Sequence, residues 1–172
     1  MDIAKHLQAR GLDISLYSWV SIFDDVALFW LWNLSGQLVG YQQYRPEADK
    51  QAKNDPRDGR YYTSIHGDKY SKPLAVWGLE SLDYRSDVLV ISEGIFDACQ
   101  FHNIGVPCVA VLSSSAKPLR NWLWCLNREI YQAIDREGSK LGQYKTLHPA
   151  PGYSDFGEMP LELTKQIWET RQ

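Results

Sequence analysis

The chain has 172 residues, of which 44% are hydrophobic and 13% aromatic, and its formal net charge is -3. This length and composition are sufficient for a hydrophobic core of ordinary size. No apolar run approaches the roughly 18 residues that a membrane-spanning helix needs, and the first residues lack signal-peptide character, so we expect a cytoplasmic protein that does not enter a membrane.

The cysteines argue against a structural zinc site. Cys99, Cys108 and Cys125 show no C-x-x-C spacing, and the four histidines are scattered along the sequence. We expect Cys99 and Cys108 to be buried packing residues. The mild net acidity does not point to a nucleic-acid partner, but it does not exclude one, because local basic patches decide such binding.

The first half of the chain predicts a small α+β unit. Residues 2–10 and 15–22 have the pattern of two short helices. Residues 26–33 and 37–44 are rich in aromatic side chains and are separated by a short turn sequence, which predicts an antiparallel hairpin.

A polar segment follows the predicted hairpin. Residues 45–60 contain two prolines and a glycine and are predicted to form a surface loop. Residues 61–65 and 73–77 are candidates for two further short strands. The unit therefore combines helices with a mainly antiparallel sheet.

The second half alternates between strands and helices. The predicted elements are strand 88–91, helix 94–104, strand 108–112, helix 117–126 and strand 129–134. The first strand is an unbroken apolar run, which is typical of a strand buried on both faces. This succession produces βαβ units with parallel strands, so the fold class is α/β.

Acidic residues follow two of these strands. Glu93 and Asp135 come directly after buried strands, and Ser113 to Ser115 follow the third. Because the carboxyl ends of parallel strands meet at one edge of the sheet, we expect these side chains to share a rim. Asp135 and Glu137, two residues apart in an extended segment, point to the same side. Three carboxylates meeting there repel one another unless a cation lies among them, so they are candidate metal ligands.

Three segments of the second half resemble, in order, the motifs of the TOPRIM domain. They are EGIFDA (93–98), VAVLSS (109–114) and AIDRE (133–137). TOPRIM domains occur in bacterial and phage primases, topoisomerases and related nucleases. The resemblance implies a mainly parallel sheet flanked by helices.

The likeness to primases extends beyond these motifs. GQLVGYQQYR (36–45), GRYYTS (59–64) and AVWGL (75–79) resemble the segments that precede TOPRIM in the catalytic core of bacterial-type primases. PGYSDFGE (151–158) resembles the segment that closes it. The shared order is more specific than any one motif.

This resemblance implies a domain division. An amino-terminal α+β subdomain covers residues 1–86 and contains the antiparallel hairpin. A TOPRIM-like domain covers 87–160, and a carboxy-terminal helix covers 161–172.

The resemblance also implies metal-dependent chemistry on nucleic-acid phosphates, with Mg²⁺ or Mn²⁺ as cofactor. Glu93 matches the family glutamate, a metal ligand or general base, and Asp135 with Glu137 matches the D-x-D pair. Hard divalent cations prefer such oxygen ligands and polarise phosphoryl groups. Asp97 matches the acidic position of E-G-x-x-D and is expected to act behind the ligands by orienting a side chain or water.

The implied function is primase-like nucleotidyl transfer on a single-stranded DNA template. The expected partners are single-stranded DNA or RNA and replication proteins, in a bacterial or phage-infected cell. Candidate residues for gripping the nucleic-acid backbone are Arg45, Arg60, Lys69 and Lys72. Two alternatives stay open: a module that binds nucleic acid or a replication protein without turnover, and a metal-dependent nickase or nuclease.

The sequence departs from the family pattern near the site. Glu137 replaces an aspartate, and the helix expected after it is missing. Ser154 stands in place of a lysine, and Gly157 in place of an asparagine. The chain also lacks the zinc module of replicative primases and a G-x-x-x-x-G-K-[ST] phosphate loop. Catalytic turnover is therefore an open question at this point.

Simpler interpretations compete with each assignment. Glu93 could be favoured by the dipole of the following helix alone, and Ser113 to Ser115 could be helix caps. The basic residues of the 41–72 region alternate with acidic ones, as in a solvated loop. Most of the seven tryptophans are expected in the core, although some could stack on bases, and Trp122 with Trp124 could mark a protein interface.

Overall fold

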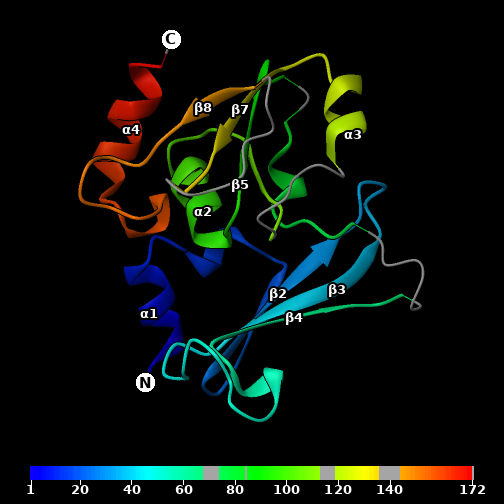
Figure 1. Ribbon diagram of the computed structural model, residues 1–172, viewed down its shortest axis with the longest axis vertical. Coiled ribbons are helices and arrows are strands. Elements are labelled where there is room, and N and C mark those ends of the chain that lie inside the picture. The colour runs from blue at the N-terminus through cyan, green and yellow to red at the C-terminus, as the bar shows by residue number, and fades with distance from the viewer. Residues whose placement is uncertain (68–73, 84, 113–118, 136–143, 172) are drawn as a thin grey trace. The chain divides into compact units, whose positions relative to one another are not determined.

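The computed structural model describes residues 1–67, 74–83, 85–112, 119–135 and 144–171. The chain forms two compact units, Met1–Ala75 and Val76–Gln172, whose elements are labelled in Figure 1. The predicted division at residues 86/87 and 160/161 stays a prediction. No helix among the described residues has the length and apolar character needed to cross a membrane.

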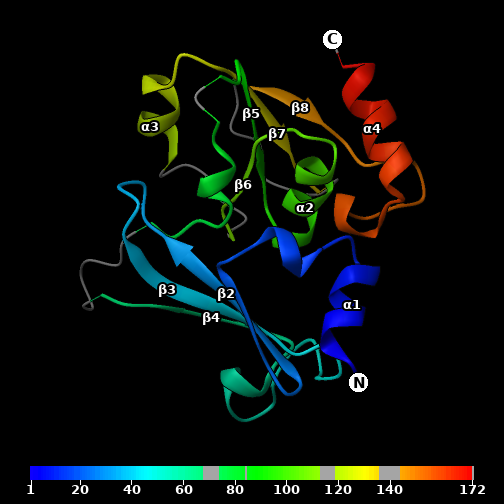
Figure 2. The ribbon, with the colours of Figure 1, turned by 180° about the vertical axis from the view of Figure 1, so that it is seen from behind.

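The first unit contains a four-stranded antiparallel sheet, which Figure 2 shows from behind. Its strands are β1 (Val20–Phe23), β2 (Val26–Trp32), β3 (Leu38–Tyr44) and β4 (Tyr61–Ile65), and they pair in this order. The predicted hairpin of β2 and β3 is confirmed. Alternate residues of β2 are buried, so one face of the strand faces the core, as the period of two requires.

The predicted helix over 15–22 is wrong. A short 3₁₀ turn, η1 (Ile14–Leu16), begins where the Asp13 side chain accepts the Ser15 N–H at 2.9 Å. The chain then enters β1, which forms a tight hairpin with β2 through Asp24 at φ 45°. The β-branched Val20 and Ile22 suit a strand, and pairing with β2 outweighs a weak helical pattern.

Helix α1 (Ile3–Ala9) is fastened to the strands by a cluster of polar aromatic contacts. The Asp2 side chain caps its first turn by accepting the Lys5 N–H at 3.2 Å. His6 Nε2 lies 2.8 Å from the Tyr44 hydroxyl, and the two rings stack. Arg10 donates to the hydroxyls of Tyr44 and Tyr61 at 3.4 and 3.2 Å. The helix is therefore attached by directional bonds as well as by buried Ile3 and Leu7.

This attachment of α1 is expected to weaken in acid. Burial lowers the pKa of His6, and the positive charges of Arg10 and Arg60 lower it further. The neutral imidazole thus contributes stability above the ordinary histidine pKa of 6.5, and that contribution is lost as the pH falls through the lower pKa of the folded protein. After correction for the intrinsic pH dependence of amide exchange, the protection of the α1 amides against hydrogen exchange should fall on acidification below pH 6.5.

The matched variant for this test is His6→Phe, which keeps a ring against Tyr44 but cannot be protonated. The protection of its α1 amides should be lower at neutral pH, because the hydrogen bond to Tyr44 is lost, and should no longer depend on pH in this range. An identical acid response in both proteins would rule out His6 as its origin.

The second unit contains a four-stranded sheet in which all neighbours are parallel. The strands are β5 (Val88–Ser92), β6 (Cys108–Ala110), β7 (Glu129–Ala133) and β8 (Lys145–Leu147), in the order β6-β5-β7-β8. The predicted parallel α/β arrangement is confirmed. Strand β8 was not predicted, because three residues with one buried side chain give no recognisable period.

The described residues of this unit include the helices α2 (Ile95–Asn103), α3 (Arg120–Cys125) and α4 (Leu161–Glu169). The Trp168 ring of α4 lies edge-on to Phe101 of α2 and to Tyr131 of β7, with ring centroids 6.2 and 5.3 Å apart. Cys99 and Cys108 are buried, as predicted. Aromatic packing therefore holds α4 against both the sheet and α2.

The predicted strand over 73–77 is, within the described residues, a single antiparallel bridge between Trp77 and Ala110. Two hydrogen bonds form it: Trp77 N–H to Ala110 O at 3.0 Å and Ala110 N–H to Trp77 O at 2.9 Å. The Trp77 side chain is fully buried and stacks on His102. The 3₁₀ turn η3 (Leu79–Ser81) begins immediately afterwards, because Gly78 takes a left-handed conformation with φ 86°.

Candidate metal and nucleic-acid site

Glu93 and Asp135 leave the parallel sheet at the same edge. Strand β5 ends at Ser92, which pairs with Ala133, the last residue of β7. Glu93 follows Ser92 at once, and Asp135 stands two residues beyond Ala133. The register of two neighbouring strands thus delivers both carboxylates to one rim.

Burial and neighbouring negative charge raise the free energy of the charged form of each of these carboxylates. Burial raises the pKa of Glu93, and the charge of Asp135 raises it further. Burial also raises the pKa of Asp135, to which the charges of Asp155 and Glu158 contribute. The rim therefore has a local excess of negative charge.

The donor atoms at this rim fit a hard divalent cation. Glu93 Oε1 is buried and has no hydrogen-bond partner among the residues that the structure describes. Such an orphaned oxygen is costly to bury unless something positive approaches it. Within the described part of the chain, no group of three or more His, Cys, Asp or Glu side chains is arranged to hold a metal. Because Mg²⁺ commonly takes one or two carboxylates and completes its shell with water and phosphate, the Glu93 and Asp135 pair meets the minimum requirement.

Other predicted residues of the rim cannot be placed. Glu137 and the serines 113–115 lie outside the described residues. Before the serines, Leu112 has φ 54°, a strained conformation for a branched side chain, and its N–H donates to the Glu93 carbonyl at 2.9 Å. The chain leaving β6 is thus anchored to the same turn that carries Glu93.

Asp97 lies behind this turn and is buried, with 7% of the residue exposed. Its Oδ2 accepts the Gly94 N–H at 3.0 Å, and its Oδ1 accepts the Gly157 N–H at 2.8 Å. Burial and then the charge of Asp155 raise its pKa to about 7, although both N–H groups oppose the shift. Both oxygens accept backbone N–H groups, and Asp97 is more deeply buried than Glu93 and Asp135, which are half-buried.

Two acidic residues near Asp135 were not among the predicted ligands. Asp155 caps the 3₁₀ turn η5 (Phe156–Glu158) and Glu158 is its last residue; Asp155 Oδ1 accepts the Glu158 N–H at 2.9 Å. Ser154, at the family's lysine position, donates to Glu158 Oε2 at 2.8 Å. The resemblance of segment 151–158 to the family's closing segment was the feature of the sequence that could have identified Asp155 and Glu158 as residues of the site. Their influence on Asp135 depends on tertiary packing that the sequence does not display.

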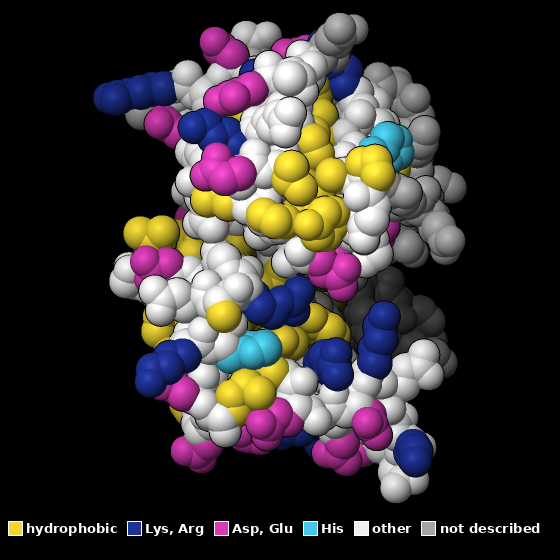
Figure 3. Space-filling view, turned by 90° about the vertical axis from the view of Figure 1, so that its left-hand side faces the viewer, with side chains coloured by type: hydrophobic (Ala, Val, Ile, Leu, Met, Phe, Trp, Pro, Cys, Tyr) yellow, Lys and Arg dark blue, Asp and Glu magenta, His cyan; other side chains and the backbone are white. Residues whose placement is uncertain are grey.

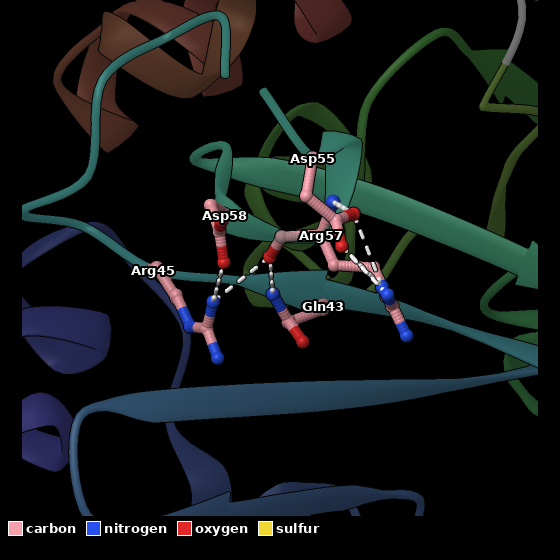
Figure 4. A network of polar contacts seen from close by, with 5 residues as sticks. All are labelled: Gln43, Arg45, Asp55, Arg57 and Asp58. Atoms are coloured by element: carbon pink, nitrogen blue, oxygen red, sulfur yellow. Dashed lines mark hydrogen bonds and ion pairs between the residues drawn. The ribbon is translucent and has the colours of Figure 1, made fainter. Parts of the chain in front are cut away.

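Arg45 holds the loop that follows β3, as Figure 4 shows. Its Nη1 donates to the Arg57 carbonyl at 2.8 Å and lies 3.8 Å from Asp58 Oδ1. Gln43 Nε2 donates to the same carbonyl at 2.8 Å. In the same loop, Arg57 forms an ion pair with Asp55, with Nη2 and Oδ2 2.6 Å apart. The loop predicted over 45–60 is therefore tied to the sheet by side-chain bonds.

Arg60 closes the same loop from its other end. Its Nε donates to the Ala48 carbonyl at 3.1 Å. Each guanidinium has five N–H donors, so the loop bonds of Arg45 and Arg60 leave others for a phosphate. Lys69 and Lys72 lie outside the described residues. The nucleic-acid role of all four stays a prediction.

The surface in Figure 3 carries basic and acidic side chains side by side, with hydrophobic groups between them. The distribution of charge on this face therefore does not by itself identify a binding surface for nucleic acid. The tryptophans also divide: Trp77 is fully buried, whereas Trp124 on α3 is 65% exposed. The protein interface suggested for Trp122 and Trp124 stays a prediction, as does base stacking by any of the tryptophans.

No protein-family model matches the sequence, and no curated protein matches it. Solved structures do match the fold. The Aquifex aeolicus primase (zinc-binding and RNA polymerase domains) aligns with a TM-score of 0.61 and 16% identity, covering 99% of this chain and 49% of that one. The primase fragment of the bacteriophage T7 primase-helicase aligns with a TM-score of 0.59 and 14% identity, covering 97% of this chain and 69% of that one.

A third match is a DnaG primase catalytic domain bound to single-stranded DNA, with a TM-score of 0.60 and 16% identity. It covers 98% of this chain and 58% of that one. This chain therefore has the fold of a primase catalytic core, and it spans about half the length of the Aquifex aeolicus primase chain. At such identities the likeness shows the fold alone.

Proposed function

We propose that this chain acts on nucleic acid through a divalent-cation site at the rim of the parallel sheet, by primase-like nucleotidyl transfer on a single-stranded DNA template. One observation carries the proposal. The buried oxygen Glu93 Oε1 has no hydrogen-bond partner among the described residues and lies in the field of Asp135. Both residues stand at the strand ends of a primase-core fold. The solved structures that share this fold include a catalytic domain bound to single-stranded DNA.

The proposed roles follow from the position of each side chain. Asp135 and Glu93 hold Mg²⁺ or Mn²⁺, with Glu137 as a third ligand. The bound ion supplies charge neutralisation at a phosphoryl group. Since the pKa of Glu93 is raised, its carboxylate is also a stronger base and can accept a proton from an attacking hydroxyl. Arg45 and Arg60 retain N–H groups for the nucleic-acid backbone.

A module that binds nucleic acid or a replication protein without turnover is the second candidate. It is favoured by Ser154, which replaces the family's lysine and is hydrogen-bonded to Glu158. A lysine there would place a positive charge next to the acidic rim, and the serine does not. Such a module needs the fold and the basic residues but not the cation.

The test combines a priming assay with plasmid nicking. The purified chain is incubated with single-stranded template, nucleotides and Mg²⁺ or Mn²⁺, and Glu93→Gln and Asp135→Asn are assayed beside it. Each substitution should reduce product by about 100-fold or more, because proton transfer and charge stabilisation are both removed. The control is Glu129→Gln, which makes the same change at the amino end of β7, where Glu129 forms an exposed ion pair with Lys145.

Primers that depend on Glu93 and Asp135 but not on Glu129 would support the proposal. Nicking without priming would favour the nuclease alternative. If neither product forms, or if product is unaffected by both substitutions, the enzymatic proposal is wrong and the binding module takes its place.

A further inference from the structure

The Asp97 carboxylate joins two segments that are far apart in the sequence. One oxygen accepts the N–H of Gly94, in the turn after Glu93, and the other accepts the N–H of Gly157, in η5. The two bonds are 3.0 and 2.8 Å long. A single side chain thus spans from the turn of β5 and α2 to the turn that carries Asp155 and Glu158.

A Cβ would be crowded at both ends of this link. A Cβ at Gly94 would lie 2.7 Å from Asp97 Oδ2. A Cβ at Gly157 would lie 2.8 Å from Phe96 Cβ and 3.2 Å from the Phe96 backbone carbon. The departure from the family's asparagine at position 157 therefore has a physical reason: the bare backbone lets η5 come close enough to α2 to reach Asp97.

The hydrogen bonds of Asp97 fix the position of η5 more closely than apolar packing against α2 would. Phe101 of α2 and Phe156 of η5 already contact one another, with ring centroids 5.2 Å apart. Burying a carboxylate beside such rings is unfavourable unless its oxygens are hydrogen-bonded. Apolar contacts permit small sliding movements, whereas two directional bonds to backbone fix the position of η5 along α2. Gln100 adds a third bond one turn later, from Nε2 to the Met159 carbonyl at 3.2 Å.

The position of η5 matters for the rim. Asp155 and Glu158 are close enough to Asp135 for their charges to raise its pKa. The Asp155 side chain is itself held by the Glu158 N–H. A displacement of η5 therefore moves both carboxylates relative to Asp135.

We propose that Asp97 is a positioning residue that touches neither cation nor substrate. It locks η5 against the start of α2 and thereby sets where Asp155 and Glu158 stand beside Asp135 and Glu93. This inference rests on the proposed function, because it assigns Asp97 to the geometry of the same cation site.

The test measures Mn²⁺ affinity by calorimetry on the full chain, at a temperature where circular dichroism shows each variant folded. Asp97→Asn replaces one accepting oxygen by an NH₂ group that opposes a backbone N–H. Gly157→Ala keeps the carboxylate but pushes η5 away from Phe96. Both should weaken Mn²⁺ binding about 10- to 100-fold, the usual effect of disturbing groups behind metal ligands.

The matched control is Ser81→Ala, in the same unit but at the amino end of β6. It removes two hydrogen bonds, from Ser81 Oγ to the Cys108 carbonyl and from the Cys108 N–H to Ser81 Oγ. It should lower the melting temperature without changing Mn²⁺ affinity. If Asp97→Asn does not fold, Gly157→Ala decides the result.

Two negative outcomes can be told apart. If wild type binds Mn²⁺ through Asp135, as judged by Asp135→Asn, but Asp97→Asn and Gly157→Ala bind equally well, the positioning role is overturned and the proposed site survives. If wild type does not bind Mn²⁺, or if Glu93→Gln and Asp135→Asn leave its affinity unchanged, the cation site itself fails and the positioning role falls with it.

Discussion

Gly40→Ala is expected to destabilise the first unit by more than about 4 kcal/mol, which exceeds nearly all single substitutions. Gly40 lies in the inner strand β3, paired with Leu31 on one side and Ile65 on the other. A Cβ there would lie 2.0 Å from the Ser64 carbonyl oxygen and 2.9 Å from the Ile65 Cα. These are backbone atoms, so no rotamer change relieves the clash, and β4 must separate from β3.

Hydrogen exchange of the β3 and β4 amides, with far-ultraviolet circular dichroism, measures this effect. The control is Gly36→Ala in the preceding turn. Gly36 has φ 74°, but nothing lies within 4 Å of a Cβ built there. The substitution to alanine should therefore lower stability only by the conformational cost of a left-handed backbone, about 1 kcal/mol. Equal losses from the two substitutions would show that strand proximity at Gly40 is not the cause.

The second large effect is a pH dependence that originates at Asp97. Its pKa is raised from 3.8 to about 7 in the folded chain. Between these values the unfolded chain releases its proton while the folded chain keeps it. The contribution of Asp97 to stability is therefore greatest below the unfolded pKa and falls as the pH rises towards about 7, by as much as about 4 kcal/mol for a shift of this size.

Urea unfolding of wild type and Asp97→Asn from pH 4 to 8 isolates this contribution. Glu93 and Asp135 also have raised pKa values and contribute a slope of the same sign, so the difference between the two proteins is the relevant quantity. That difference should change with pH, because asparagine does not titrate. Parallel stability curves would exclude Asp97 as the source.

Segments with a long, clear pattern were predictable from the sequence. The apolar run of β5 indicated a strand buried on both faces, and parallel pairing with β6 and β7 followed from the helices between them. Short segments were not. Residues 15–22 contain a 3₁₀ turn and β1, because hairpin pairing with β2 outweighs a marginal helical pattern. Strand β8 has three residues and pairs with β7, a contact that its own local pattern does not indicate.

The same distinction applies to the candidate site. The positions of Glu93 and Asp135 follow from strand ends, so local patterns were enough to bring them to one rim. The contribution of Asp155 and Glu158 depends on how η5 packs against α2, which is set by Gly157 and Phe96. No periodicity reports that contact. Likewise, the sequence shows Arg45 and Arg60 as basic residues of a polar loop but does not show that each donates a hydrogen bond to a loop carbonyl in the folded chain.

The bridge between Trp77 and Ala110 has a consequence for handling the protein. Strand β6 is the last strand on its side of the sheet, and unpaired backbone at such an edge recruits strands from other molecules. The backbone of Trp77 forms hydrogen bonds with both the N–H and the carbonyl of Ala110. Trp77 is the second residue of the second unit, which begins at Val76. A fragment that starts at Val76 retains this cover, whereas one that starts at Asp87 uncovers β6 and should self-associate.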